Sequence, residues 1–235
     1  MDRITRKELK KDRFAEEVTH TVEYVSEHKK QVTRYGVIAL AAVVAAAGIY
    51  YYTKWQAGKR AGELAAALEL QNAYVGPAGA NPSVKNFPTQ EAKSQAVAKA
   101  FRELAGRYSG SDEGVLARYY LGTQAADEGR FDEAERSLKE VAASKNADYA
   151  SLAQFTLAEI GSARGKTAEA EKLLRALIEK PTVFVSKTQA TIALARLLAS
   201  TRPDEARKLV EPLRLEAGPA ARAAFEILNN LPNKG

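Results

Sequence analysis

Few residues in the chain could do chemistry. The sequence holds two histidines, His20 and His28, and no cysteine. Without cysteine there is no disulfide, no thiolate nucleophile and no cysteine-bound zinc or iron–sulfur centre. The histidines are eight residues apart, roughly one helical turn too far to share a metal ion, so we expect surface histidines. The rest of the chain has no imidazole, which excludes a Ser-His-Asp triad there.

Acidic pairs and a glycine-containing loop are the remaining candidates for chemistry. Asp132 and Glu133 stand at the expected start of a helix, where the positive end of the helix dipole favours carboxylates. Gly76 and Gly79 lie in a loop that lacks the lysine and the helix start of a phosphate-binding motif. The sequence therefore predicts no catalytic residue, no cofactor and no metal, although an enzyme of unknown type stays an alternative.

The composition predicts helices to position these residues. The chain has 235 residues, 46% of them hydrophobic and 27% charged, which is typical of a globular protein. Its 44 alanines, against 15 glycines and 8 prolines, suit closely packed helices. The net charge of +6 is spread among mixed acidic and basic residues, without a basic stripe, so we expect no nucleic-acid partner.

A run of nineteen uncharged residues separates Arg34 from Lys54. As a helix it would span roughly 28 Å, close to the thickness of the bilayer core. Aromatic residues cluster at both ends, as they do at membrane interfaces. We therefore predict a transmembrane helix over 35–53, with these interface residues: Arg34, Tyr35, Tyr50, Tyr51, Tyr52, Lys54 and Trp55.

Two alternatives to a span are an interior helix of a soluble domain and a cleaved secretory signal. A signal peptide has a short basic leader, whereas 34 residues precede this run, so we favour an uncleaved signal anchor. The tail 1–34 carries nine Lys and Arg residues, and a long following domain can cross the membrane largely regardless of its charge. We therefore predict a cytoplasmic N-terminus.

The tail itself shows a helical pattern from about Asp12 to Arg34. Its apolar residues fall on one face of a helix: Phe14, Val18, Val22, Val25 and Val32. We predict an amphipathic helix that lies on the inner membrane surface or docks on a membrane partner.

The rest of the chain repeats itself with a period of 36 residues. Ala134, Ala170 and Ala206 are equivalent positions in three copies. Hydrophobic columns follow at Leu138, Leu174 and Val210, and at Val141, Leu177 and Leu213. Two amphipathic helices in such a period predict a solenoid of helical hairpins. We place three repeats near 115–148, 151–184 and 187–218. They lie in a domain over 89–235, with capping helices over 89–108 and 219–231. A juxtamembrane helix and loop over 54–88 precede this domain.

These repeats resemble the tetratricopeptide repeat family. The matches within 115–148 are Leu121, Gly122, Ala125, Gly129, Phe131, Ala134, Leu138 and Val141. Gly122 is small where two helices cross, and Gly129 permits the turn between them. The early tryptophan of the family is absent, and Pro212 should kink or shorten the last full helix. The resemblance implies an all-α fold in which the tail helix and one transmembrane helix precede a tetratricopeptide-like solenoid.

In tetratricopeptide hairpins the first helix of each pair lines a groove. The resemblance places Tyr119, Phe155 and Thr191 there, with Thr123 and Glu159 beside them. These residues do not form the Lys and Asn clamp that holds acidic peptide tails, so we expect an apolar extended or helical guest, with the two rings as anchors. The alternative is that both rings are core residues, which pack between hairpins or under the helix over 89–108.

The order of tail, span and repeats resembles a bacterial inner-membrane family, the ancillary subunits of the Sec translocon. That resemblance implies a periplasmic repeat domain and protein partners, namely translocon subunits and extracytoplasmic chaperones or clients, with no small-molecule substrate. The alternative is a tethered tetratricopeptide scaffold for envelope assembly or cell division.

Overall fold

The computed structural model of the chain describes residues 28–76 and 85–232. The chain divides into two compact units, Met1–Lys59 and Arg60–Gly235. His20 and most of the predicted amphipathic tail helix, with Phe14, Val18, Val22 and Val25, lie outside the described residues.

A single long helix, α2 (Lys29–Gln71), carries the uncharged run. It contains an 18-residue stretch with a mean hydropathy of 1.8 and no buried residue, so it is long and apolar enough to cross a membrane. All seven predicted interface residues lie on it, and the Nζ of Lys59 lies 4.4 Å from the ring centre of Trp55. Such exposed apolar side chains need a lipid or protein neighbour.

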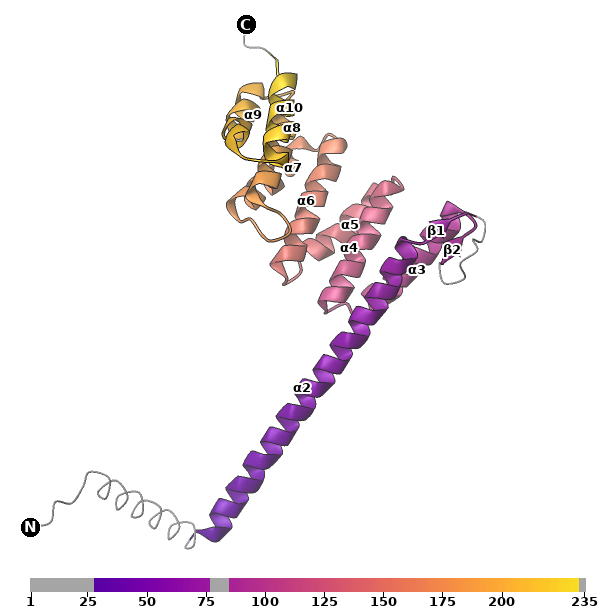
Figure 1. The fold of residues 1–235 in the computed structure, drawn as a ribbon, viewed down its shortest axis with the longest axis vertical. Coiled ribbons are helices and arrows are strands. Elements are labelled where there is room, and N and C mark those ends of the chain that lie inside the picture. Colours follow the sequence, from indigo (N-terminus) through magenta and orange to yellow (C-terminus); the bar gives the residue numbers. More distant parts are fainter. Residues whose placement is uncertain (1–27, 77–84, 233–235) are drawn as a thin grey trace, which may run out of the picture. The chain divides into compact units, whose positions relative to one another are not determined.

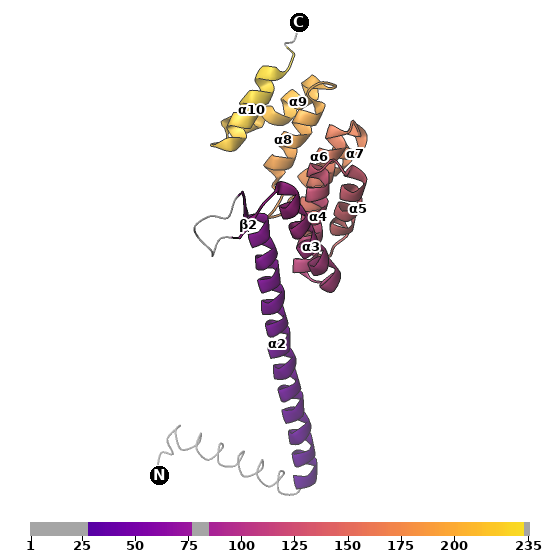
Figure 2. The same cartoon turned by 90° about the vertical axis from the view of Figure 1, so that its right-hand side faces the viewer.

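The second unit is a succession of antiparallel helices (Figures 1 and 2). They are α3 (Gln90–Arg107), α4 (Asp112–Asp127), α5 (Phe131–Ala142), α6 (Ala147–Ala163), α7 (Thr167–Glu179), α8 (Lys187–Leu198), α9 (Pro203–Val210) and α10 (Pro219–Asn230). A 3-10 helix, η1 (Glu211–Leu215), precedes α10, and β1 (Tyr74–Val75) pairs in parallel with β2 (Asn86–Phe87). The predicted all-α solenoid is confirmed.

The repeated small residues lie where the helices of a hairpin cross. Ala134, Ala170 and Ala206 are each 0% exposed. A Cβ atom added at Gly122 would lie 2.8 Å from the Cγ of Leu138, so only glycine allows this approach of α4 to α5. Gly129 joins the same two helices with a φ of +76°, a conformation that favours glycine. The predicted core of the repeat is thus confirmed.

The end of α2 packs against α3 as a further helical hairpin. Ala67 is 2% exposed and belongs to one cluster with Val97 and Phe101 of α3. The Tyr108 hydroxyl and the Arg107 guanidinium both donate hydrogen bonds to Glu63. One helix pair therefore precedes the first repeat that the 36-residue period shows.

Pro212 ends the last full helix, as predicted. The helix α9 has 8 residues, whereas its counterparts α5 and α7 have 12 and 13. The chain continues as η1, because proline lacks the amide donor that an α-helix needs.

Ion pairs with the same 36-residue period join successive hairpins. Glu135 of α5 accepts hydrogen bonds from Arg164 and Lys166, both 2.6 Å away. These two residues lie in the turn between α6 and α7, in the next hairpin. Glu171 stands 36 residues later and pairs with Arg202 in the same way. The interaction is therefore a property of the repeat.

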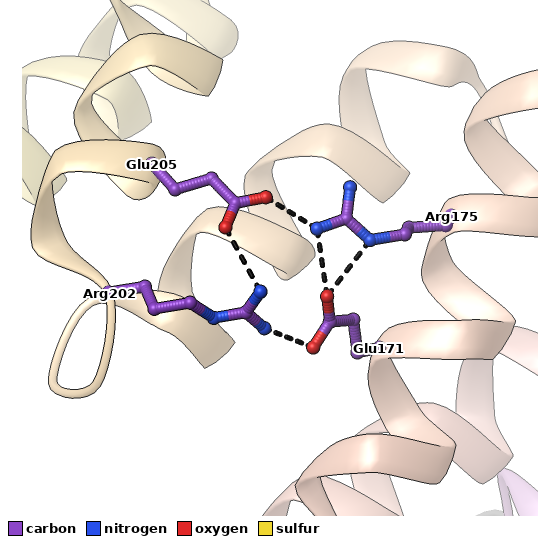
Figure 3. A network of polar contacts seen from close by, with 4 residues as sticks. All are labelled: Glu171, Arg175, Arg202 and Glu205. Atoms are coloured by element: carbon purple, nitrogen blue, oxygen red, sulfur yellow. Dashed lines mark hydrogen bonds and ion pairs between the residues drawn. The ribbon is translucent and has the colours of Figure 1, made fainter.

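The second of these clusters is a closed ring of four side chains (Figure 3). Glu171 accepts from the Nε and Nη2 atoms of Arg175, at 2.9 and 2.8 Å, and from Arg202. Glu205 completes the ring by accepting from both arginines. Two carboxylates and two guanidinium groups alternate, so each charge has opposite neighbours and α7 is tied to α9.

Candidate functional site

The first helices of the last hairpins line a groove of about 810 Å³. Its floor and walls come from α6, α8 and α10, with Leu174 of α7 and Ala217 at the edges. The lining residues are Phe155, Ala158, Glu159, Ser162, Ala163, Leu174, Thr188, Gln189, Ile192, Ala193, Arg196, Leu197, Ala217, Pro219, Ala220 and Ala223.

Small apolar residues make up most of this surface. Six alanines line the groove, and the larger apolar side chains of Phe155, Ile192 and Leu197 stand among them. Phe155 and Leu197 also pack against the core cluster beneath the groove, which holds them in place. An alanine-rich surface lets a guest approach the helix backbones closely, and the volume is that of a typical binding site.

Two charges of opposite sign stand in this apolar surface. Glu159 comes from α6 and Arg196 from α8. Burial by the groove wall raises the pKa of Glu159, and the nearby positive charge of Arg196 opposes that shift. Arg196 also lies 3.8 Å from Glu226 of α10. The groove can therefore orient a guest by charge while binding it through apolar contact.

The structure brings two of the five predicted groove residues, Phe155 and Glu159, into this groove. Tyr119 of α4 is half-buried, and its hydroxyl lies 3.1 Å from the Oγ1 of Thr156 on α6. Thr123 donates to the carbonyl oxygen of Tyr120 at 3.0 Å. Thr191 is 8% exposed and donates to the carbonyl oxygen of Lys187 at 2.8 Å. These three residues lie outside the groove.

The reason lies in how neighbouring helices share a groove. Since α6 and α8 lie beside each other, each turns a different flank toward the space between them. The period makes Phe155 of α6 equivalent to Thr191 of α8. On α6 the side of the helix that carries Phe155 faces the groove, whereas on α8 the side that carries Ile192 faces it. Equivalent positions therefore cannot both line the same groove.

Sequence reasoning placed Thr191 of α8 in the groove but missed the residues of α8 that line it, and it missed α10 altogether. Ile192, Ala193 and Arg196 of α8 follow helical spacing, and Pro219 and Ala220 open α10. The alanine pairs of α10 could have indicated its role. A helix that only caps a solenoid has a polar outer face, so alanines on that face suggest that it contacts something further.

No catalytic or metal-binding constellation accompanies the groove. In the part of the chain that the structure describes, no three or more acidic, histidine or cysteine residues gather at one point. The groove contributes one carboxylate, Glu159, and its lining includes no histidine or cysteine.

The fold and the groove define a helical-repeat scaffold for binding proteins. The sequence model of a family described as a tetratricopeptide repeat-like domain matches residues 28–208, and the chain belongs to this family. Repeats of this family are non-catalytic interaction scaffolds. The match begins one residue before α2 and so includes the apolar run. No curated protein and no solved structure shows significant similarity to the chain.

Proposed function

We propose that the protein is a membrane-tethered scaffold that captures an apolar segment of a partner protein in the groove of α6, α8 and α10. The observation that carries this proposal is the groove itself, which offers about 810 Å³ between apolar helix flanks. A rigid apolar surface with few charges suits a segment that leaves water when it binds.

The chemistry of the groove defines the guest. Bulky aliphatic side chains fit against the alanines of α8 and α10, in the manner of a helix in a groove. A basic residue on the guest would pair with Glu159 and an acidic one with Arg196. The charges would fix the direction in which the guest lies, while burial of its apolar face would supply most of the affinity.

The tether is the apolar part of α2. We assign residues 35–53 to a single transmembrane helix with the N-terminus in the cytoplasm and the repeats outside it. Exposed apolar side chains along the helix and the aromatic residues at both ends of the run support this assignment.

We further propose that the partners are components of the bacterial protein-translocation machinery, or the chaperones and clients that meet them outside the inner membrane. The support is the order of tail, apolar helix and tetratricopeptide-like repeats, together with an apolar groove suited to segments of unfolded chains. A scaffold for envelope assembly or cell division would bind a different set of proteins.

The test is to fill the groove and compare the proteins that copurify in mild detergent. Ala193→Trp places an indole in the groove, whereas Ala176→Trp places it on the exposed surface of α7, outside the groove. We expect the groove variant to lose translocon subunits or chaperones, and the control to retain them. Equal recovery with both variants would refute capture by the groove. Recovery of division or cell-wall enzymes instead would favour the alternative.

A further inference from the structure

Glu159 is a carboxylate set in an apolar wall of the groove. On α6 it lies one helical turn after Phe155 and one turn before Ala163, and all three residues line the groove. The lining carries two charged side chains, Glu159 and Arg196. A carboxylate in such surroundings loses part of its hydration, and a cation from a guest would compensate for that loss.

Glu159 has no hydrogen bond and no ion pair among the residues that the structure describes. Burial raises its pKa, and the charge of Arg196 opposes this shift only in part. Glu135 and Glu171 contrast with it, because hydrogen bonds from basic side chains lower their pKa values. Glu159 is therefore a groove carboxylate that the fold leaves without a partner.

Arg196, the one cation in the lining, already faces carboxylates on two neighbouring helices. It lies 3.8 Å from Glu226 on α10, and its charge also acts on Glu159 of α6. One cation thus serves two carboxylates. An acidic guest residue placed beside Arg196 would be repelled by both of them, whereas a basic guest residue would meet the unpaired Glu159.

The other cations of these helices do not supply a partner for Glu159. Arg164, in the turn after α6, is engaged by Glu135 at 2.6 Å. Lys187 begins α8 and lies nine residues before Arg196, which is roughly 14 Å along the helix. Arg222 of α10 is exposed and is not part of the groove lining.

We propose that the groove selects a basic amphipathic segment, whose apolar face packs against the alanines of α8 and α10 and whose lysine or arginine, on the flank of that face, pairs with Glu159. This inference deepens the proposed function and rests on capture of a guest by the groove. Because Glu159 stands between Phe155 and Ala163 on the wall, the basic residue has apolar neighbours one turn before and after it in the guest.

Three fluorescent helical peptides with the same leucine and alanine apolar face test this selection. They differ at one position on the flank of that face, which is Lys, Gln or Glu. Binding to the full chain is measured in nanodiscs of neutral phosphatidylcholine, with the groove-filled Ala193→Trp variant as background. We expect the Lys peptide to bind about threefold more tightly than the Gln peptide, and the Glu peptide more weakly than both, since partly exposed charge pairs contribute modestly.

Two variants assign the selection to the carboxylate of Glu159. Glu159→Gln keeps the size of the side chain, so its thermal unfolding should match that of the parent protein while the advantage of the Lys peptide disappears. Glu159→Lys should reverse the order of the three peptides. Glu179→Gln removes an exposed carboxylate at the end of α7, outside the groove, and as the matched control it should keep the preference for Lys.

The outcomes separate this selection from capture itself. Equal binding of the three peptides that is lost in Ala193→Trp would overturn the selection of a basic segment and leave capture by the groove intact. A preference for Lys that survives Glu159→Gln, or tighter binding of the Glu peptide, would overturn it as well. Binding of all three peptides that persists unchanged in Ala193→Trp would refute the proposed function and this inference together.

Discussion

Gly122 and Gly106 are both helical glycines, but a methyl group added at each would meet different surroundings. At Gly122 the new Cβ would lie 2.8 Å from Leu138, whereas at Gly106 nothing lies within 4 Å. Gly122→Ala gains helix propensity but overpacks the crossing, so we expect the free energy of unfolding to fall by about 1 kcal/mol. The melting midpoint should drop by roughly 2 to 4 °C.

Gly106→Ala is the control for this prediction. Its exposed site should accept the methyl group and gain about 0.5 kcal/mol, since alanine loses less backbone entropy on folding. Thermal unfolding of both variants in the same detergent gives the comparison. If Gly122→Ala melts no lower than the parent protein, α4 and α5 do not pack as closely at this position as described.

The sequence predicted which residues are buried in the repeats better than which residues line the groove. The alanine column was predictable because residues that fill equivalent contacts recur with the period, and all three alanines are fully buried. Groove residues do not recur in this way, because each helix presents a different flank to its neighbour. The resemblance to tetratricopeptide hairpins placed Phe155 in the groove, which it lines, but it did not point to Ile192, and the side chain of Thr191, which it also placed there, is nearly buried.

Glu171 couples two successive hairpins, because it accepts from Arg175 of its own helix and from Arg202 of the next turn (Figure 3). A single exposed ion pair contributes little to the stability of the fold, but removing one carboxylate from a closed ring of four charges breaks several contacts at once. We expect Glu171→Gln to lower the free energy of unfolding by about 1 kcal/mol. Glu211→Gln, which removes an exposed pair with Arg214 inside η1, should change it by less than about 0.5 kcal/mol.

The pH dependence of unfolding gives the same prediction an independent readout. Hydrogen bonds from Arg202 and Arg175 hold the pKa of Glu171 below its usual value. The stabilisation is therefore complete above the unfolded glutamate pKa of about 4.3 and is lost as pH falls through the lowered folded pKa. Acidification should destabilise the parent protein more than Glu171→Gln. Identical pH profiles for the two would show that the ring does not stabilise the fold.

One pairing of helices could not be predicted from the sequence. The hairpin of α2 and α3 has no counterpart in the 36-residue period, because the segment 72–89 between its helices is much longer than the turns of the repeats. Its core is nevertheless a regular cluster around Phe101. Helix positions follow from local periodicity, whereas the pairing of helices across a long connection depends on contacts that no short pattern encodes.

For the molecule as a whole, the proposed orientation predicts which compartment reaches the repeats. The tail carries nine basic residues, and we expect it to stay in the cytoplasm while the repeats cross the membrane. Protease added to intact spheroplasts should then digest the repeat unit and spare a small membrane-embedded fragment. A repeat unit that is cut only after the membrane is broken would reverse the orientation, and one released in soluble form would show that the apolar run does not anchor it.

The central claim is that the groove of α6, α8 and α10 receives a partner protein, and crosslinking from inside the groove tests it most directly. A photoreactive residue at Gln189, exposed at the groove, should give a discrete crosslinked product in living cells. The same residue at Lys172, exposed on α7 away from the groove, should not. The product from Gln189 should also disappear in Ala193→Trp. A product of equal yield from both positions, or one that survives the filled groove, would contradict the claim.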